Sequence, residues 1–182
     1  MRVLQQEQGR RGHHQESKAV RGSAVVFAVR TINESNMVRI KIPLAEGNLA
    51  GAEAEWVWAQ PLEDGTYEVK NVPFYAKGIS CEDAVAAKPE DGVLVFERVA
   101  RHSGHSTYRI YANEGRTAPE VVALLGTLRD LHCDIGPATD KLVGVNVPPG
   151  ADVYKVYETM AESERAGLID FDEGHCGHPL RT

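Results

Sequence analysis

The stretch Arg101–Ala112, RHSGHSTYRIYA, decides how this 182-residue chain is expected to fold. Its second half alternates between two kinds of side chain, as a β-strand with two unlike faces does. Side chains of a strand point to opposite sides in turn, so one face carries His105, Thr107, Arg109 and Tyr111, and the other carries Ser106, Tyr108 and Ile110. We therefore predict a strand over 106–112 with one face rich in titratable and anion-binding groups.

The sequence after this strand predicts helices and strands in turn. Thr117 and Glu120 fit a capping box, and a helical apolar pattern then runs to about Cys133. Two short strands, around Ile135 and over 142–147, are expected to form a hairpin through residues 139–141. The second helix is expected to begin at Asp152, with its apolar stripe at Val153, Val156, Tyr157 and Met160.

A last strand over 168–171 completes the order β-α-β-β-α-β, which predicts a ferredoxin-like unit over residues 101–174. Both helices of such a unit cover one face of its sheet. The more apolar face of the 106–112 strand is the natural one to meet them. His105 and Arg109 are therefore expected on the opposite face.

The sequence before residue 101 is rich in strand patterns. Strands are expected over 38–42, 55–59, 66–69 and 93–96, with Asp64-Gly65 as a hairpin turn and residues 80–85 as a short helical or turn segment. Trp56 and Trp58 share a face and are expected to pack in a core. Residues 23–100 are therefore predicted to form an antiparallel β-rich sheet or small barrel, and the whole protein an α+β fold.

The two ends of the chain differ from this body. Residues 1–22 are polar with almost no apolar content, which predicts a disordered tail, and Met37 is an alternative translation start. Residues 175–182 are expected to form a C-terminal tail. They include the run His175-Cys176-Gly177-His178, which with His132-Cys133 offers metal ligands at a spacing that matches no standard zinc site.

Composition limits the classes of function. The chain carries a net charge of −6, which argues against nonspecific binding to nucleic acid or to a membrane surface. Cys81, Cys133 and Cys176 form no CxxC pair, so we expect reduced thiols and a cytoplasmic location. Neither GxGxxG nor GxxxxGK[ST] is present, and no apolar run is long enough to span a bilayer. We therefore predict no cofactor, no metal and no membrane association.

The candidate site is the polar face of the 106–112 strand together with the residues before it. Histidine titrates near neutral pH and arginine binds anions, so His102, His105 and Arg109 are the candidate catalytic residues. The candidate ligand-binding residues are Arg101, Ser103, Thr107, Tyr111, Asp83 and Asn146. His105 and Arg109 lie about 13 Å apart along an extended strand, which favours an elongated groove over a compact catalytic centre. The alternative is that these side chains only form structural bonds with carboxylates.

Three segments together resemble a known family. They are Asn71–Ser80 (NVPFYAKGIS), Arg101–Arg109 (RHSGHSTYR), and Asp172-Glu173-Gly174 leading to His178-Pro179. The chain resembles bacterial domain of unknown function family 4265 over about residues 38–179. The resemblance implies a small bacterial cytosolic protein and implies no activity.

Three hypotheses about function follow. The first is a binding or regulatory accessory protein, including inhibitor or immunity types, whose acidic body meets a protein partner or a small polar ligand. The second is a metal-independent hydrolase or transferase acting on a phosphorylated or nucleotide-like substrate, with His102 and His105 as acid and base and Arg109 holding the anion. The third is RNA binding, with Tyr111 and the two tryptophans as stacking groups.

Overall fold

The computed structural model describes residues 36–46 and 51–179. Residues 33–182 form one compact unit, and its described part contains nine strands and two helices. The expected disordered tail over residues 1–22 lies outside the described residues, as do the last three residues of the expected C-terminal tail. Everything below concerns the described part of this unit.

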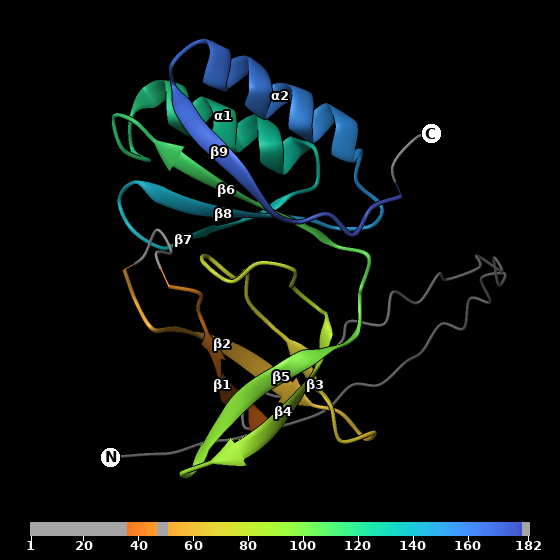
Figure 1. Ribbon diagram of the computed structural model, residues 1–182. Coiled ribbons are helices and arrows are strands. Elements are labelled where there is room, and N and C mark those ends of the chain that lie inside the picture. Colours follow the sequence, from red (N-terminus) through yellow and green to blue (C-terminus); the bar gives the residue numbers. More distant parts are fainter. Residues whose placement is uncertain (1–35, 47–50, 180–182) are drawn as a thin grey trace, which may run out of the picture. The chain divides into compact units, whose positions relative to one another are not determined.

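The first five strands form a closed barrel (Figure 1). They are β1 (Val38–Pro43), β2 (Ala54–Pro61), β3 (Tyr67–Val69), β4 (Ala84–Glu90) and β5 (Val93–Arg101). Successive strands pair antiparallel, and a short parallel pairing of β1 with β5 closes the barrel. The expected α+β class and the small N-terminal barrel are confirmed.

One expectation for this part holds only in part, and another is wrong. Residues 80–85 contain a turn, but strand β4 begins at Ala84 and runs to Glu90. Its sequence, AVAAKPE, has little intrinsic strand preference, so pairing with β5 decides its conformation. Trp56 and Trp58 point outward, because Glu55, Val57 and Ala59 occupy the interior face of β2. Instead of a core, the Arg39 guanidinium covers both indole rings.

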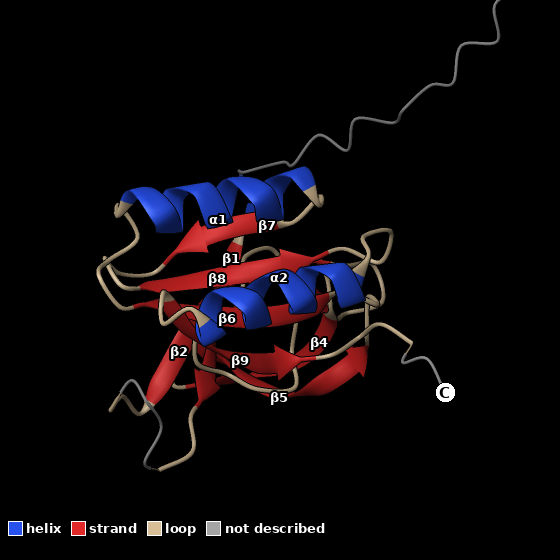
Figure 2. Ribbon diagram, turned by 90° about the horizontal axis from the view of Figure 1, so that it is seen from above, coloured by secondary structure: helices blue, strands red, loops and turns tan. Residues whose placement is uncertain are grey.

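The second half of the chain forms a four-stranded sheet covered on one face by two helices (Figure 2). Its elements are β6 (Ser106–Ala112), α1 (Pro119–Asp130), β7 (Asp134–Pro137), β8 (Leu142–Val147), α2 (Val153–Arg165) and β9 (Ile169–His175). The strand order is β7-β8-β6-β9, and all neighbours pair antiparallel. Among the described residues, no helix has the length and apolar content that crossing a bilayer requires.

The two helices begin in different ways. Asp152 caps α2, and its carboxylate accepts the amide hydrogens of Tyr154 and Lys155 as expected. The capping box expected at Thr117 is wrong, because α1 begins at Pro119 after Ala118 without a side-chain cap. Proline tolerates the first helical position well, because its missing N–H has no partner there in any helix.

The apolar face of β6 builds the core under the helices. Tyr108 and Ile110 are buried with Val121 and Leu128 of α1 and Met160 of α2. A second core fills the barrel, around Ile40, Val57 and Val85. The predicted division of β6 into a core-facing half and a polar half is therefore present in the structure.

The segment Asn71–Asp83 links β3 to β4, and we call it the connection. Ala76 and Ile79 of the connection are buried in the barrel core. Its Val72 and Phe74 approach Gly144 of β8 so closely that a Cβ atom there would lie 2.8 Å and 3.0 Å from them. The connection thus lies between the barrel core and the sheet, and covers much of the polar face of β6.

Candidate functional site

The polar face of β6 carries the residues that the sequence singled out, but the structure divides them into two groups. Thr107 is fully buried and donates to the Ser80 hydroxyl of the connection at 2.8 Å. It therefore separates the region around His105 from the region around Arg109. Arg101 stands apart from both groups, largely exposed and 3.8 Å from Asp64.

Arg109 is a buried cation that joins three segments. Its Nε and Nη2 donate to the two carboxylate oxygens of Asp172 on β9, both at 2.6 Å, and its Nη1 donates to the Tyr75 carbonyl at 3.1 Å. Such bidentate pairing fixes the geometry as well as the charge. The Lys77 ammonium also lies 3.5 Å from Asp172. With its charge neutralised by Asp172, Arg109 positions the connection and is not a free anion clamp.

A cavity of about 1020 Å³ lies next to Arg109, and we call it the groove. Its walls come from the end of β1 and the segment after it, from β5, from the connection and from the sheet. They are largely apolar: Ile42, Leu44, Phe74, Tyr75, Phe96, Tyr111, Leu142 and Phe171. Pockets for small ligands span about 300–1000 Å³ and combine apolar walls with a few polar groups. The groove has the size and composition of a binding site.

The charges that line the groove favour a cationic occupant. Its described lining contains two basic residues, Lys77 and Arg109, and three acidic ones, Glu46, Asp170 and Asp172. Tyr111 stands at its edge and is 48% exposed. None of the candidate histidines lines the groove, so the polar groove expected around Arg101–Arg109 is an apolar groove at the Arg109 end alone.

Asp83 organises the second group of residues. Its fully buried carboxylate accepts the backbone N–H of Ser80 at 2.9 Å, and both the N–H and the hydroxyl of Ser103, at 2.7 and 2.9 Å. His102 Nδ1 lies 3.1 Å from Asp83 Oδ2, and a carboxylate only accepts, so this nitrogen carries the hydrogen. Asp83 and His102, two separate candidates from the sequence, are therefore direct partners.

The His102 ring stacks on the ring of His175, the last residue of β9. The ring centroids lie 4.5 Å apart and the planes differ by 16°. The His102 side chain is 50% exposed, whereas His175 is more buried, and burial lowers the pKa of His175 below its ordinary value, with the neighbouring His102 adding to the effect. The neutral form of His175 is thus favoured beside an exposed imidazole.

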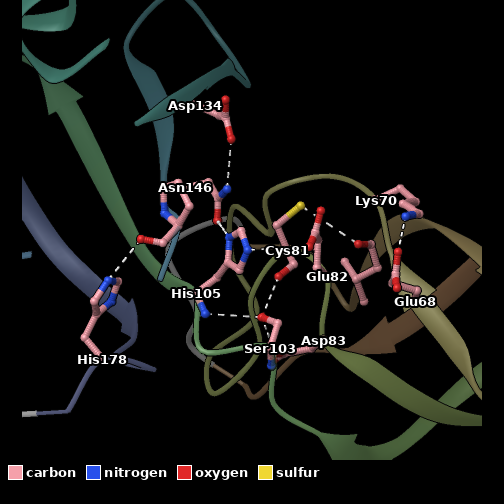
Figure 3. Close-up of polar contacts among 12 residues, drawn as sticks. Glu68, Lys70, Cys81, Glu82, Asp83, Ser103, His105, Asp134, Asn146 and His178 are labelled. Atoms are coloured by element: carbon pink, nitrogen blue, oxygen red, sulfur yellow. Dashed lines mark hydrogen bonds and ion pairs between the residues drawn. The ribbon is translucent and has the colours of Figure 1, made fainter. Parts of the chain in front are cut away.

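His105 joins the Asp83 group through its backbone N–H, which donates to the Ser103 hydroxyl at 3.2 Å, and its ring extends the polar contacts further (Figure 3). Asn146 donates from its amide nitrogen to Asp134 at 3.1 Å, so its oxygen faces His105 Nδ1 at 2.9 Å and accepts from it. The His105 Nε2 then faces the Glu82 carboxylate at 3.6 Å. Because His105 is buried, its ring presents little surface to a substrate.

The end of the described chain is anchored to β6. The Ser106 hydroxyl lies 2.7 Å from His178 Nδ1, and it accepts the backbone N–H of Gly177 at 3.0 Å. A Cβ atom on Gly177 would lie 2.3 Å from the His105 carbonyl, so only glycine fits this approach. His178 is buried, and His175 meets His102 instead of pairing with His178 in a common site.

Sequence reasoning missed the residue that holds the groove wall in place. Glu55 of β2 is buried, and its carboxylate accepts the backbone N–H groups of Phe74, Tyr75 and Ala76 at 2.6, 2.9 and 2.8 Å. No signal in the sequence indicated this role, because the expected inward tryptophans placed Glu55 on the outer face of the strand. A buried carboxylate requires donors, and the connection supplies them.

Comparison with known proteins places the chain in a family. A family model described as "Domain of unknown function (DUF4265)" matches residues 55–171. The chain belongs to this family. The match confirms the expected membership and spans Glu55, Asp83, His102 and Arg109, and it assigns no activity to the DUF4265 chain.

A solved structure is also similar. It is titled "Novel crystal structure of a hypothetical protein from Neisseria gonorrhoeae" and covers 77% of this DUF4265 chain and 95% of its own, at 20% identity and a TM-score of 0.68. At this identity the likeness shows a shared fold alone. No curated protein matches the chain.

Proposed function

We propose that this protein is a binding or regulatory accessory protein whose groove receives an apolar segment of a partner protein that carries positive charge. The groove itself is the observation that supports the proposal. It combines about 1020 Å³ of space, largely apolar walls and an excess of carboxylates over basic groups. The net charge of −6 also favours the approach of a basic partner.

The groove is preorganised on the side of the connection. Glu55 fixes three successive backbone amides of that wall, and Arg109 binds the Tyr75 carbonyl between them. A wall held by such bonds loses little conformational freedom when a ligand binds, which favours affinity. The exposed Tyr111 is the aromatic side chain best placed to contact the occupant first.

Peptide binding tests the proposal. The probe is a fluorescein-labelled peptide of alternating leucine and lysine, measured by fluorescence anisotropy, with the same peptide carrying glutamate in place of lysine as its counterpart. We expect the lysine peptide to bind more tightly. Tyr111→Ala is expected to weaken binding at least about fivefold, as removal of an interface aromatic does. Tyr157→Ala is the matched control, because Tyr157 is 52% exposed on α2.

Charge variants separate a cationic from an anionic occupant. Asp170→Asn removes an exposed carboxylate from the groove, and Lys77→Gln removes an exposed ammonium. We expect the first to weaken binding of the lysine peptide and the second to strengthen it, each by about 1.5- to 5-fold. Asp130→Asn, on α1, is the control for the first. Tighter binding of the lysine peptide to Asp170→Asn together with weaker binding to Lys77→Gln would overturn the assignment of charge.

The Asp83–His102 pair supports a second candidate, a metal-independent hydrolase or transferase on a phosphorylated substrate. A buried carboxylate that holds Nδ1–H leaves the other nitrogen of a half-exposed imidazole available as a base. We expect turnover of p-nitrophenyl phosphate to fall at least about a hundredfold in His102→Gln. Equal rates in both proteins, or none in the wild type, would dismiss this candidate.

We also propose the finer assignments that the sequence predicted. The element order β-α-β-β-α-β and the antiparallel strand order β7-β8-β6-β9 support a ferredoxin-like class for the C-terminal sheet. The three cysteines are unpaired, which supports a reducing, cytoplasmic location.

A further inference from the structure

Three side chains of the kinds that bind metal ions meet at the end of β9. Asp83 comes from the connection, His102 follows β5, and His175 ends β9. One ligand atom from each lies within 4.8 Å of the others. Because the three residues are far apart in sequence, no spacing motif indicates this cluster. None of them lines the groove, so the cluster is separate from the proposed peptide site.

His175 supplies an independent sign that a ligand belongs here. Its Nε2 is buried and has no hydrogen-bond partner among the described residues. Burying a polar atom without a partner costs about 1–3 kcal/mol, so native proteins rarely leave one unexplained. No other buried side-chain nitrogen or oxygen in the described part of the chain lacks a partner. The exception therefore falls within the cluster of potential ligands.

Asp83 is held in the way that a ligating carboxylate is. The backbone N–H of Ser80 and the N–H and hydroxyl of Ser103 fix its two oxygens from the protein side. Such outer hydrogen bonds orient a metal ligand and sharpen affinity. On the remaining side Oδ2 meets only His102 Nδ1, at 3.1 Å. Ligands about 2.0–2.1 Å from a tetrahedral zinc ion lie about 3.3 Å from one another, so this separation suits a shared ion.

We propose that Asp83, His102 and His175 bind a divalent transition-metal ion of the zinc class. Imidazole and carboxylate ligands suit zinc and its neighbours cobalt and nickel. Three protein ligands leave a fourth position, which the exposed side of His102 opens to water.

Binding changes the histidine pair in two ways. A metal ion lies in the plane of each imidazole it binds, so the two rings must turn out of their stack. His102 is half exposed and has one hydrogen bond, to Asp83, so it turns with the least loss of packing. As the ion takes the place of the hydrogen on His102 Nδ1, that hydrogen is lost to solvent and Nε2 gains one, so the ring stays neutral, the form in which imidazole binds metal ions.

Titration of the full chain with Zn²⁺ after chelator treatment, followed by calorimetry, tests the proposal. We expect His102→Gln and His175→Gln each to weaken one binding event at least tenfold. His132→Gln is the matched control, since His132 is an exposed histidine outside the cluster, and it is expected to leave that event unchanged. These variants spare the fully buried Asp83, whose loss threatens folding.

A spectroscopic readout separates this site from other histidines, including His13 and His14 near the start of the chain. Co²⁺ bound at the cluster is expected to absorb in the visible range, and His102→Gln and His175→Gln are each expected to remove that absorption. Unchanged Zn²⁺ affinity in either variant, or unchanged Co²⁺ absorption in both, overturns the proposal.

Discussion

The carboxylate of Glu55 offers the sharpest test of how the groove wall is built. It accepts three backbone N–H bonds from Phe74, Tyr75 and Ala76 in a buried setting. In Glu55→Gln, the single amide oxygen at the Oε2 position still accepts from Tyr75 and Ala76, but an NH2 group then faces the Phe74 donor. The variant thus loses one hydrogen bond, and its two remaining hydrogen bonds have a neutral acceptor in place of a charged one.

The magnitude follows from these contacts. A hydrogen bond to a charged group contributes about 1.5–3 kcal/mol, and each of the two retained bonds weakens by about 0.5–1 kcal/mol. We therefore expect the free energy of unfolding to fall by about 2.5–5 kcal/mol. For a chain of this size the midpoint of thermal unfolding falls by about 5–20 °C.

Urea and thermal unfolding followed by circular dichroism measure this change. Glu53→Gln is the matched control, because Glu53 is exposed and only two residues away, and we expect its effect to stay within about 0.5 kcal/mol. If Glu55→Gln is as stable as the control variant, the carboxylate does not hold the connection, and the account of the groove wall is wrong.

Three further predictions concern single positions. Gly144→Ala is expected to destabilise the protein by about 1–3 kcal/mol, because the added methyl group meets side chains of the connection. Gly126→Ala in α1 has free space around its methyl group and is expected to stabilise the protein by about 0.5–1 kcal/mol. Chemical denaturation of both variants would contradict this if the two changes in stability had the same sign. Burial raises the pKa of the Cys81 thiol to about 11, so the reactive thiolate is scarce at pH 8 and grows about tenfold per pH unit up to that pKa. Alkylation by iodoacetamide, read by mass spectrometry, should rise accordingly, and a rate independent of pH between 8 and 10 would refute this. Asp152→Ala removes the cap of α2 and is expected to cost about 1 kcal/mol in thermal unfolding, while an unchanged midpoint would show that the cap contributes nothing.

The sequence predicts those features that depend on local alternation. It assigns Tyr108 and Ile110 to the core face of β6 and Arg109 to the opposite face, and the structure agrees. Alternation suffices here because a strand buried on one face cannot slip by one residue without exposing its apolar side chains. The cap at Asp152 is predicted as well, because it too is local and acts on amides within three residues.

Features that depend on contacts between distant segments could not be predicted in this way. Strand β4 has a sequence that favours no strand, and its pairing with β5 forms only in the closed barrel. Glu55 looks like an ordinary strand residue until the connection lies over it. The orientation of Trp56 was mispredicted because the interior of a five-stranded barrel is too narrow for indole rings, and Val57 fills it instead.

In the candidate site too, local features were predicted and contacts between distant segments were not. His102 and Asp83 were both candidates from the sequence. The contact of His175 with His102 was not predicted, because β9 extends four residues beyond the predicted strand end at 171 and carries His175 to His102. Arg109 was predicted as an anion clamp because its partner Asp172, which lies opposite it on the neighbouring strand β9, is 63 residues away in the sequence. Pairings of this length are set by the order of strands and not by local pattern.

Chemical-shift mapping tests the central claim, that the groove is the binding site, most directly. In the ¹⁵N-labelled protein titrated with the alternating leucine–lysine peptide, we predict that the amide signals of Lys77, Tyr111 and Leu142, which line the groove, shift together and saturate. The signals of Trp58 on the outer face of the barrel should stay in place. Shifts centred on Trp58, or no shift at any peptide concentration, would contradict the account.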